Sequence, residues 1–308
     1  MVEVVPVEVA ELERVVLVHN AVRRNDPTTV EEFVDWRRQA EDMAWLVAVA
    51  DGEDAGAAIG LVGWHLPPQT AIVEAWTLPE ARSRGIGTAL YEELLRWSSE
   101  RGCLAVHTAV DEDDGASLAW ADRRGFREIG RNSRLVLDLD RIDAPSIDPP
   151  AGIEITTWAE RPGIEHALYE VYVEAAPDVP GQEDTDLSPF ETWLAHDMQG
   201  LSDRPEAVFV ALAANEVVGY GKLSLPHTWT GNAFHDLIGV KRAWRGRGIA
   251  AALKRAQIAW AKAQGYGRLV TQNEERNEPI RRLNTRYGYH IEPGRVFLRT
   301  AIGGTDRA

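Results

Sequence analysis

The sequence has few residues of the kinds that build covalent or metal cross-links. Cys103 is the only cysteine among 308 residues, which excludes an intrachain disulfide, and no cysteine–histidine cluster has zinc-site spacing. No apolar run approaches the roughly 20 residues that a membrane helix needs, and the first residues are acidic where a signal peptide is basic. We therefore expect a cytoplasmic protein with no bound metal, in which Cys103 is a small buried residue.

Positive charge is also in short supply. Lysine and arginine number 33 against 48 aspartates and glutamates, so the net charge at pH 7 is −15. This excess of negative charge argues against a general affinity for nucleic acid or for anionic membranes. It is compatible with a cationic substrate, although an acidic surface that only favours solubility would look the same.

What the sequence does contain is an internal repeat. At an offset of 163 residues, ARSRGIGTAL (81–90) aligns with WRGRGIAAAL (244–253). Without a gap, the identities continue through Trp97 and Trp260 to Gly125 and Gly288. Two arginine–glycine runs with the same downstream spacing indicate duplicated domains.

The boundary between the copies is predicted in RIDAPSIDPPAG (141–152), whose three prolines are typical of a linker. We therefore predict an N-terminal domain over 1–145 and a C-terminal domain over 151–308. Each copy has the pattern of an early strand, a helical region, three strands, an arginine–glycine turn, a helix, a strand and a short helix. The expected strands and early helices are 2–7, 10–24, 44–50, 58–64 and 71–77 in the first copy, and 153–157, 164–175, 207–213, 217–225 and 233–240 in the second. This order predicts an α/β fold with a mixed sheet.

In both copies a strand enters the turn and a helix leaves it. The N–H groups at a helix start have no intrahelical partner and, with the helix dipole, form a site for an anion. Small residues leave room for a phosphate, and arginines add charge-assisted contacts; a tight turn with solvated arginines is the alternative. The candidate anion-binding residues are Arg82, Arg84, Gly85, Ile86, Gly87 and Thr88, and Arg245, Gly246, Arg247, Gly248, Ile249 and Ala250.

The pattern Arg-x-x-Gly-x-Gly/Ala after a strand resembles the pyrophosphate-binding signature of the GNAT superfamily of N-acetyltransferases. NEPIRRLNTRYGY (277–289) is similar to the later segment of that family, and DGASLAWADRRGF (114–126) is a weaker copy. The resemblance implies two tandem GNAT-like domains, each a twisted mixed β-sheet flanked by helices, with acetyl-CoA as co-substrate. It also implies that Asn277 contacts the cofactor or caps its helix.

In the family, the strand before the turn splays from its neighbour and frees a backbone N–H that polarises the thioester carbonyl. The resemblance places this group at Val240, preceded by Ile238 and Gly239, or at Thr77 in the first copy. A tyrosine of the later helix often protonates the leaving thiolate. That position holds Asn284 here, which donates a hydrogen bond but is no acid, and Ala121 in the first copy.

A base that accepts the amine proton usually projects from the same strand. Residues two apart share a face of a strand, so we expect Asp236 to lie on the face of Ile238 and Val240. The matching residue in the first copy is Val73, with Glu74 on the opposite face. We therefore predict Asp236 as the base, although it is alternatively a structural carboxylate.

Two neighbouring side chains are assigned by default to the core. His235 points to the other face in this interpretation and is predicted to be structural. Tyr287 is close to Asn284 on the helix and is either a substitute proton donor or a core residue.

These assignments predict a catalytic C-terminal domain and a degenerate N-terminal domain that still binds acetyl-CoA. The acceptor is predicted to be a primary amine of a small molecule. Glu183, Asp184 and Asp186 would attract a cation, and Trp229 lines the acceptor pocket or covers the core. A non-catalytic acetyl-CoA sensor, and a first domain that serves only as a scaffold, are the competing hypotheses. Monomer and homodimer both remain open.

Overall fold

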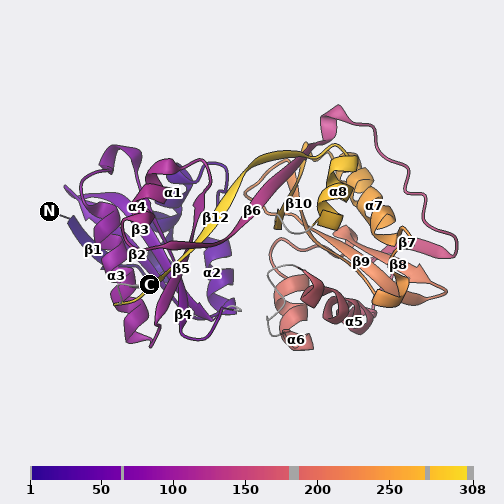
Figure 1. Ribbon diagram of the computed structural model, residues 1–308, viewed down its shortest axis with the longest axis horizontal. Helices are drawn as coiled ribbons and strands as arrows, with labels where there is room; N and C mark the ends of the chain where they lie inside the picture. Colours follow the sequence, from indigo (N-terminus) through magenta and orange to yellow (C-terminus); the bar gives the residue numbers. More distant parts are fainter. Residues whose placement is uncertain (1, 64–65, 180–186, 275–277, 304–308) are drawn as a thin grey trace. The chain divides into compact units, whose positions relative to one another are not determined.

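The computed structural model in Figure 1 describes residues 2–63, 66–179, 187–274 and 278–303. The chain forms two compact units, one of Met1–Arg131 with Arg295–Ala308 and one of Asn132–Gly294. Each unit is a mixed sheet flanked by helices, which confirms the predicted fold class. None of the helices within the described ranges is long and apolar enough to cross a membrane.

The sheet of the first unit has the strand order β1-β2-β3-β4-β5-β12. Its strands are β1 (Val2–Pro6), β2 (Ala40–Ala50), β3 (Glu53–Gly63), β4 (Thr70–Thr77), β5 (Ala105–Asp111) and part of β12 (His290–Ala301). Neighbours are antiparallel except β4 and β5. These two parallel strands pair only from Thr70 to Ile72, so they diverge toward the end of β4.

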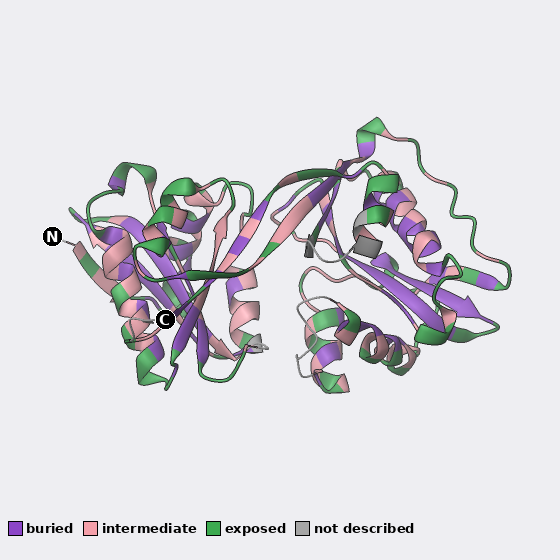
Figure 2. Ribbon diagram, viewed as in Figure 1, coloured by how far each residue is buried: buried purple, intermediate pink, exposed green. Residues whose placement is uncertain are grey.

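Helices cover both faces of this sheet. Helices α1 (Leu12–Val22) and α2 (Val30–Gln39) pack on one face, and α3 (Ile86–Glu100) and α4 (Gly115–Asp122) pack on the other. The strands alternate accordingly, since Trp45 contributes to the α1 side and Leu46 to the α3 side. The strands between these layers are therefore largely buried (Figure 2).

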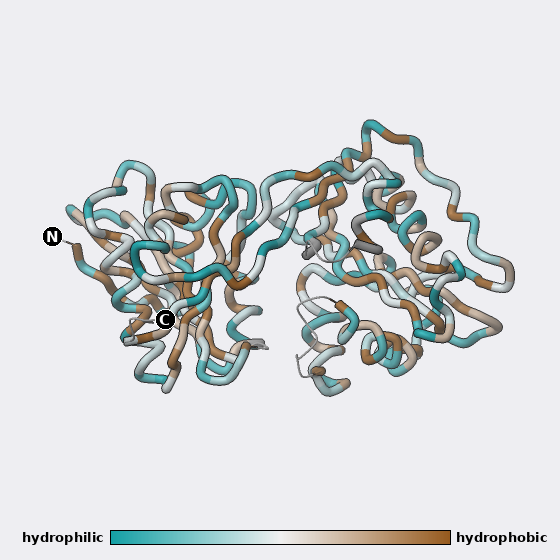
Figure 3. The backbone as a smooth tube through the Cα atoms, viewed as in Figure 1, coloured by the Kyte–Doolittle hydropathy of each residue, from teal (hydrophilic) through white to brown (hydrophobic). Residues whose placement is uncertain are grey.

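The sheet of the second unit has the order β6-β11-β10-β9-β8-β7. Its strands are β6 (Arg127–Asp138, of which residues from 132 belong to this unit), β7 (Ile153–Thr157), β8 (Val208–Ala213), β9 (Glu216–Ser224), β10 (Asn232–Val240) and β11 (Arg268–Glu274). The parallel pair is now β10 and β11. Strand β8 has the sequence VFVALA and is buried throughout, as a strand covered on both faces requires (Figure 3).

The helices of the second unit follow the same plan. Helix α5 (Glu165–Ala175) packs with α6 (Phe190–Trp193) on one face of the sheet. Helix α7 (Ile249–Ala263) packs on the opposite face, where Tyr289, just after α8 (Glu278–Arg286), joins the same cluster. Ten expected strands and helices, up to the arginine–glycine turns, are therefore confirmed, within a few residues at their ends.

The last strand of each unit comes from the other half of the sequence. In the first unit, Arg295–Ala301 of β12 pairs antiparallel with β5. In the second unit, Asn132–Asp138 of β6 pairs antiparallel with β11. The predicted pattern of each copy ended at its short helix and contained neither strand. The proline-rich segment 141–152 therefore joins β6 to β7 within one compact unit, and the predicted division between 145 and 151 follows the repeat rather than the contacts.

Candidate active site

Helices α3 and α7 begin in the same way. Their N-cap residues are Gly85 (φ 86°) and Gly248 (φ 85°), in a left-handed conformation that favours glycine. The first backbone bonds run from the Ala89 N–H to the Gly85 carbonyl and from the Ala252 N–H to the Gly248 carbonyl. The three N–H groups before each donor have no place in the helical ladder, so both turns have the donors that an anion requires.

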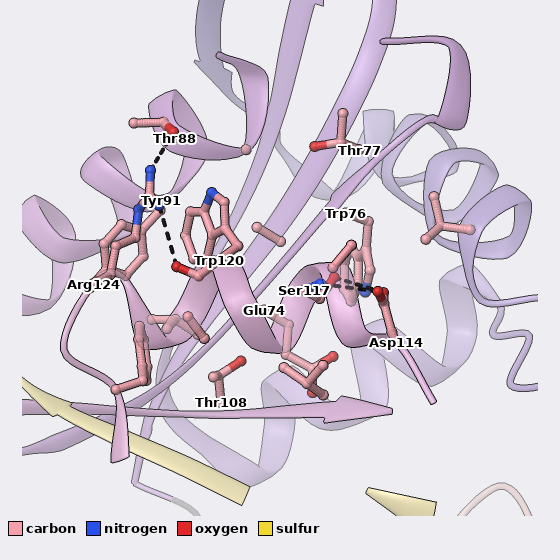
Figure 4. A pocket seen from close by; sticks show the side chains of 18 of the residues that line it. Glu74, Trp76, Thr77, Thr88, Tyr91, Thr108, Asp114, Ser117, Trp120 and Arg124 are labelled. Carbon is pink, nitrogen blue, oxygen red and sulfur yellow. Dashed lines mark hydrogen bonds between the residues drawn. The ribbon is translucent and has the colours of Figure 1, made fainter. Parts of the chain in front are cut away.

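A cavity of about 690 Å³ opens beside this turn in the first unit. It is bordered by the turn residues Arg82, Gly85, Ile86, Gly87 and Thr88, by Thr77 of β4, and by residues of β5 and α4. Figure 4 shows Thr77 and Thr88 on separate elements around this space, with Trp120 of α4 between them and Glu74 and Thr108 further along. A single cavity therefore runs from the anion-binding turn to the diverging ends of β4 and β5.

The predicted oxyanion groups lie where β4 and β10 leave their parallel neighbours. The Lys241 N–H donates to the carbonyl of Val218 in β9 at 2.9 Å, and the Leu78 N–H donates to the carbonyl of Ala55 in β3 at 3.0 Å. Successive N–H groups of a strand point to opposite edges, so those of Val240 and Thr77 point to the edge where pairing has ended. This orientation suits a group that stabilises a developing oxyanion.

Strand β10 contains an irregularity that overturns the predicted face of Asp236. Its register against β9 shifts between His235 and Ile238, so that Asp236 and Leu237 together face a single residue, Lys222. This β-bulge breaks the alternation of faces. Asp236 consequently does not share a face with Ile238 and Val240, which pack toward α7, and lies on the α5 side of the sheet.

The carboxylate of Asp236 is held by a buried lysine. Lys222 Nζ lies 2.6 Å from Asp236 and 2.9 Å from Asp203. The Asp236 side chain is 46% exposed, whereas those of Lys222 and Asp203 are nearly fully buried. Burial alone would lower the pKa of Lys222, but the two carboxylates raise it above its usual value. The group therefore carries one cation and two carboxylates, and only Asp236 reaches solvent.

The first unit also has a carboxylate in this region, at Glu74. Strand β4 pairs with β3 without a bulge, which directs Glu74 to the α1 side of the sheet. Glu74 borders the cavity and accepts a hydrogen bond from Arg295 at 2.9 Å. Glu74 and Asp236 therefore lie on the same side of their sheets although they occupy non-matching repeat positions, because only β10 has the bulge.

The turn arginines divide into two groups. Arg82 borders the cavity, as predicted for a phosphate contact. Arg84 instead pairs with Asp51, and Arg245 binds Asp178 at 2.7 Å and the Val240 carbonyl at 2.9 Å. Arg247 stacks on Trp244 with 4.6 Å to the ring centroid. Arg245 therefore holds the end of β10 in place. The prediction that Arg245 binds an anion did not include this contact.

The remaining predicted second-unit residues have varied surroundings. A Cβ on Gly239 would meet that of Ala175 in α5 at 2.9 Å, which explains the glycine, and Gly246 has a φ of 74°. Trp229 is buried against Phe234 and covers the core. Asn277, Glu183, Asp184 and Asp186 lie outside the described residues, and their assignments stay predictions.

The two units differ at four matching positions where the helices after the turn pack against the sheet, a region called the base of the helix layer below. In the first unit, four residues there border the cavity: Tyr91, Leu94, Ala121 and Phe126. The residues at the same repeat positions in the second unit are Lys254, Gln257, Asn284 and Tyr289, all of them buried. A largely apolar base in one unit is therefore polar in the other.

His235 connects this polar group. Its imidazole bonds Gln257 at 3.1 Å and the Tyr289 hydroxyl, and Lys254 Nζ lies 4.7 Å from the Tyr289 ring centroid. Burial lowers the pKa of His235 and of Lys254 well below their usual values. The structural role predicted for His235 is consistent with these contacts. The backbone carbonyl of Asn284 accepts hydrogen bonds from the backbone N–H groups of Tyr287 and Tyr289.

Comparison with protein families identifies the chain. The acetyltransferase (GNAT) family profile matches residues 12–126 and 165–289. The chain belongs to this family. It is an N-acetyltransferase, and acetyl-CoA is its co-substrate.

Several relatives match over most of the chain, and one of them is named as a tandem protein. The mycothiol acetyltransferase of Nocardia farcinica is 27% identical over 278 residues, covering 84% of this chain and 82% of the relative. That of Catenulispora acidiphila is 26% identical over 231 residues, covering 70% and 68%. A GCN5-related N-acetyltransferase of Sphaerobacter thermophilus has 25% identity and a TM-score of 0.76 over 98% of this chain and 96% of that one. A tandem GNAT protein of the clavulanic acid pathway shares the fold, with a TM-score of 0.80 at 22% identity over 99% and 100% of the two chains.

The residues of both turns fit acetyl-CoA. The unbonded N–H groups at the starts of α3 and α7 suit its pyrophosphate, and the glycine N-caps leave the approach open. In the first unit, the cavity continues from these donors to the Thr77 backbone. The sequence interpretation missed Lys222, Arg23 and Arg295, which hold the carboxylates. The carboxylates of Asp236, Asp111 and Glu74 lie on other strands, so no local motif indicates these pairs.

Proposed function

We propose that the protein acetylates the primary amine of a small cationic molecule and that the second unit carries this reaction. The bulge at Asp236 is the observation on which the proposal rests. The bulge places Asp236 on the α5 side of the sheet, where 46% of its side chain is exposed. Buried Lys222 Nζ lies 2.6 Å from the carboxylate and holds it in place. An exposed, immobilised carboxylate beside the diverging strands is suited to orient an ammonium group and to pass its proton to water.

The local charge favours a cation. Asp203 and Asp236 share the single positive charge of Lys222, so the group retains a net negative charge. A protonated amine would supply the missing charge, in keeping with the overall net charge of −15. The relatives that match over most of both units are named mycothiol acetyltransferases, and that name supports a small-molecule acceptor.

The backbone of β10 is suited to act on the thioester of acetyl-CoA. The Val240 N–H points to the open edge, where it is suited to stabilise charge on the thioester oxygen. Acetyl-CoA supplies the acetyl group and a thiolate leaving group. Asn284 offers at most a hydrogen bond there, so we assign protonation of the thiolate to water.

Asp236→Asn tests this function. With diamines such as putrescine and cadaverine as acceptors, we expect kcat/KM to fall about a hundredfold or more, because an amide cannot take a proton. Release of the CoA thiol gives the rate. Gly248→Glu, which places a carboxylate at the predicted phosphate site, should also abolish turnover.

Glu154→Gln is the matched control, since Glu154 is an exposed acid on β7 that pairs with Arg161. It should retain wild-type rates. Full diamine turnover by both Asp236→Asn and Gly248→Glu would place the reaction outside the second unit and overturn the proposal.

A further inference from the structure

We propose that the first unit is a second acetyl-transfer site, with Glu74 as its base, and that its acceptor is a zwitterionic amine that also carries a carboxylate. Diamino acids belong to this class. The proposal rests on the acetyl-transfer chemistry of the family and not on which acceptor the second unit uses. Its basis is a charged network at one end of the cavity that already holds the anion-binding turn.

Four ionic side chains border that end of the cavity: Arg23 just after α1, Glu74 of β4, Asp111 of β5 and Arg295 of β12. Arg23 lies 2.6 Å from Asp111, and Arg295 lies 2.9 Å from Glu74. Arg295 also donates to the Ala109 carbonyl at 2.9 Å. Arg295 Nε also lies 3.8 Å from Asp111, so the four charges form a connected group.

Three of the four side chains in this group are largely buried. The side chains of Arg23, Glu74 and Arg295 are only 12%, 19% and 22% exposed. Ion pairs taken out of water are costly and give little net stability, so a folding role alone is a weak reason for placing them along a cavity. Their common border with Thr77 and the α3 turn places them along the same space as the acetyl-CoA groups.

The balance of charge selects the acceptor. Two guanidinium groups and two carboxylates border this end of the cavity, whereas Asp26, which also pairs with Arg23, is not among the residues that border it. The Lys222 group of the second unit has one cation and two carboxylates. A diamine carries only positive charge, so the two arginines would repel it. An acid without an amine carries only negative charge, so the two carboxylates would repel it. A molecule with an amine and a carboxylate provides an opposite charge for each kind of group.

Specific roles follow from the contacts. Glu74, fixed by Arg295, binds the acceptor ammonium and passes one proton to water. The neutral nitrogen then forms the C–N bond as the C–S bond of the thioester breaks. The electron pair of that bond stays on sulfur, which takes a proton from water, and the second amine proton leaves through Glu74. Arg23 binds the acceptor carboxylate, since its two ion pairs use one N–H on each terminal nitrogen out of five donors.

The test compares amino acids with their decarboxylated partners on the full chain. L-Ornithine is paired with putrescine and L-lysine with cadaverine, and acetylated products are separated and quantified. We expect Glu74→Gln to lower the ratio of diamino-acid to diamine turnover about a hundredfold and Asp236→Asn to raise it. Arg23→Gln should raise KM for the diamino acid about tenfold at unchanged kcat, and Arg23→Lys should restore part of that affinity.

Arg96→Gln is the control, because Arg96 is an exposed α3 residue whose ion pairs with described residues, Glu93 and Glu100, both lie on its own helix. Unfolding midpoints matching the wild type show that each variant folds. The proposal fails if no diamino acid is acetylated, or if Glu74→Gln leaves the ratio unchanged. Failure of the proposed function looks different, because diamine turnover would then survive Asp236→Asn and be lost in Glu74→Gln.

Discussion

The two units share a glycine-capped helix, a diverging pair of parallel strands and a carboxylate on the same side of the sheet. They reach that carboxylate by different routes. The first unit has a regular β4 that presents Glu74, and the second has a bulged β10 that presents Asp236. A lysine serves two carboxylates in one unit, and two arginines serve two carboxylates in the other. Duplicated frameworks can therefore keep a function at one place in space while the residue and its counter-ions change.

The largest expected difference concerns these counter-ions. Lys222→Met leaves Asp203 and Asp236 without their cation, and loss of one partner from a buried pair costs about 3–5 kcal/mol. Arg295→Met should cost less, about 1–3 kcal/mol, because the side chains of Arg295 and Glu74 are 22% and 19% exposed whereas those of Lys222 and Asp203 are 5% and 6% exposed. Urea unfolding of both variants gives the free energies. Equal losses would show that the two carboxylates are held with similar strength.

The polar base of the second unit gives the next prediction. Lys254 is buried without a carboxylate among its described contacts, so Lys254→Met should stabilise the fold by about 1–4 kcal/mol. Tyr91→Leu, at the matching position of the first unit, removes an aromatic contact with Trp120 and should destabilise it. Denaturant unfolding measures both. A destabilised Lys254→Met protein would mean that the ammonium makes a favourable contact that outweighs its burial.

Buried histidines predict a loss of stability in acid. Burial lowers the pKa of His235 in the second unit and of His19 in the first. The unfolded chain binds a proton at each site below about pH 6.5, while the folded chain does not until the pH reaches the lowered value. Stability present above pH 6.5 is therefore lost as the pH falls, by up to about 2 kcal/mol per histidine at pH 5.

Unfolding free energies at pH 7.5 and pH 5 measure this loss. His235→Asn should reduce the difference between the two pH values, and the exposed His290→Asn should not. An unchanged difference in His235→Asn would show that His235 is protonated without cost in the folded unit.

The smallest effect concerns helix starts. Helix α2 has a capping box in which Thr29 and Glu32 bond each other's backbone N–H groups, whereas α5 in the second unit has Ile164 at its N-cap and no side-chain cap. Thr29→Ala should cost about 1 kcal/mol. Thermal unfolding checks this, with the exposed Glu31→Gln as control. An equal shift in both variants would mean that first-turn charge, rather than the cap, stabilises α2.

Local features of the fold followed from the sequence, and non-local ones did not. The turns at Gly85 and Gly248 and the strands before them were predictable, because glycine position and apolar pattern are local properties. The bulge at Asp236 depends on how β10 aligns with β9, which no pattern within β10 reveals. A one-residue change in register reverses every face assignment beyond it, and this explains why Asp236 was assigned to the wrong face.

The exchanged strands follow the same rule. Residues 295–301 pair with 105–111, so their partner lies in the other half of the chain. The hydrogen bond from Arg295 to Glu74 depends on that pairing, so the sequence alone does not predict it.

This exchange has a consequence for the protein during its synthesis. When the ribosome has made the first half of the chain, β5 has no neighbour on one side, and its partner residues 295–301 have not yet been translated. At ordinary elongation rates the wait is roughly ten to forty seconds. Throughout it the nascent first unit exposes an unpaired strand edge, the kind of surface that chaperones and other nascent chains bind. The sheet whose strands are translated first is therefore the last of the two that can be completed.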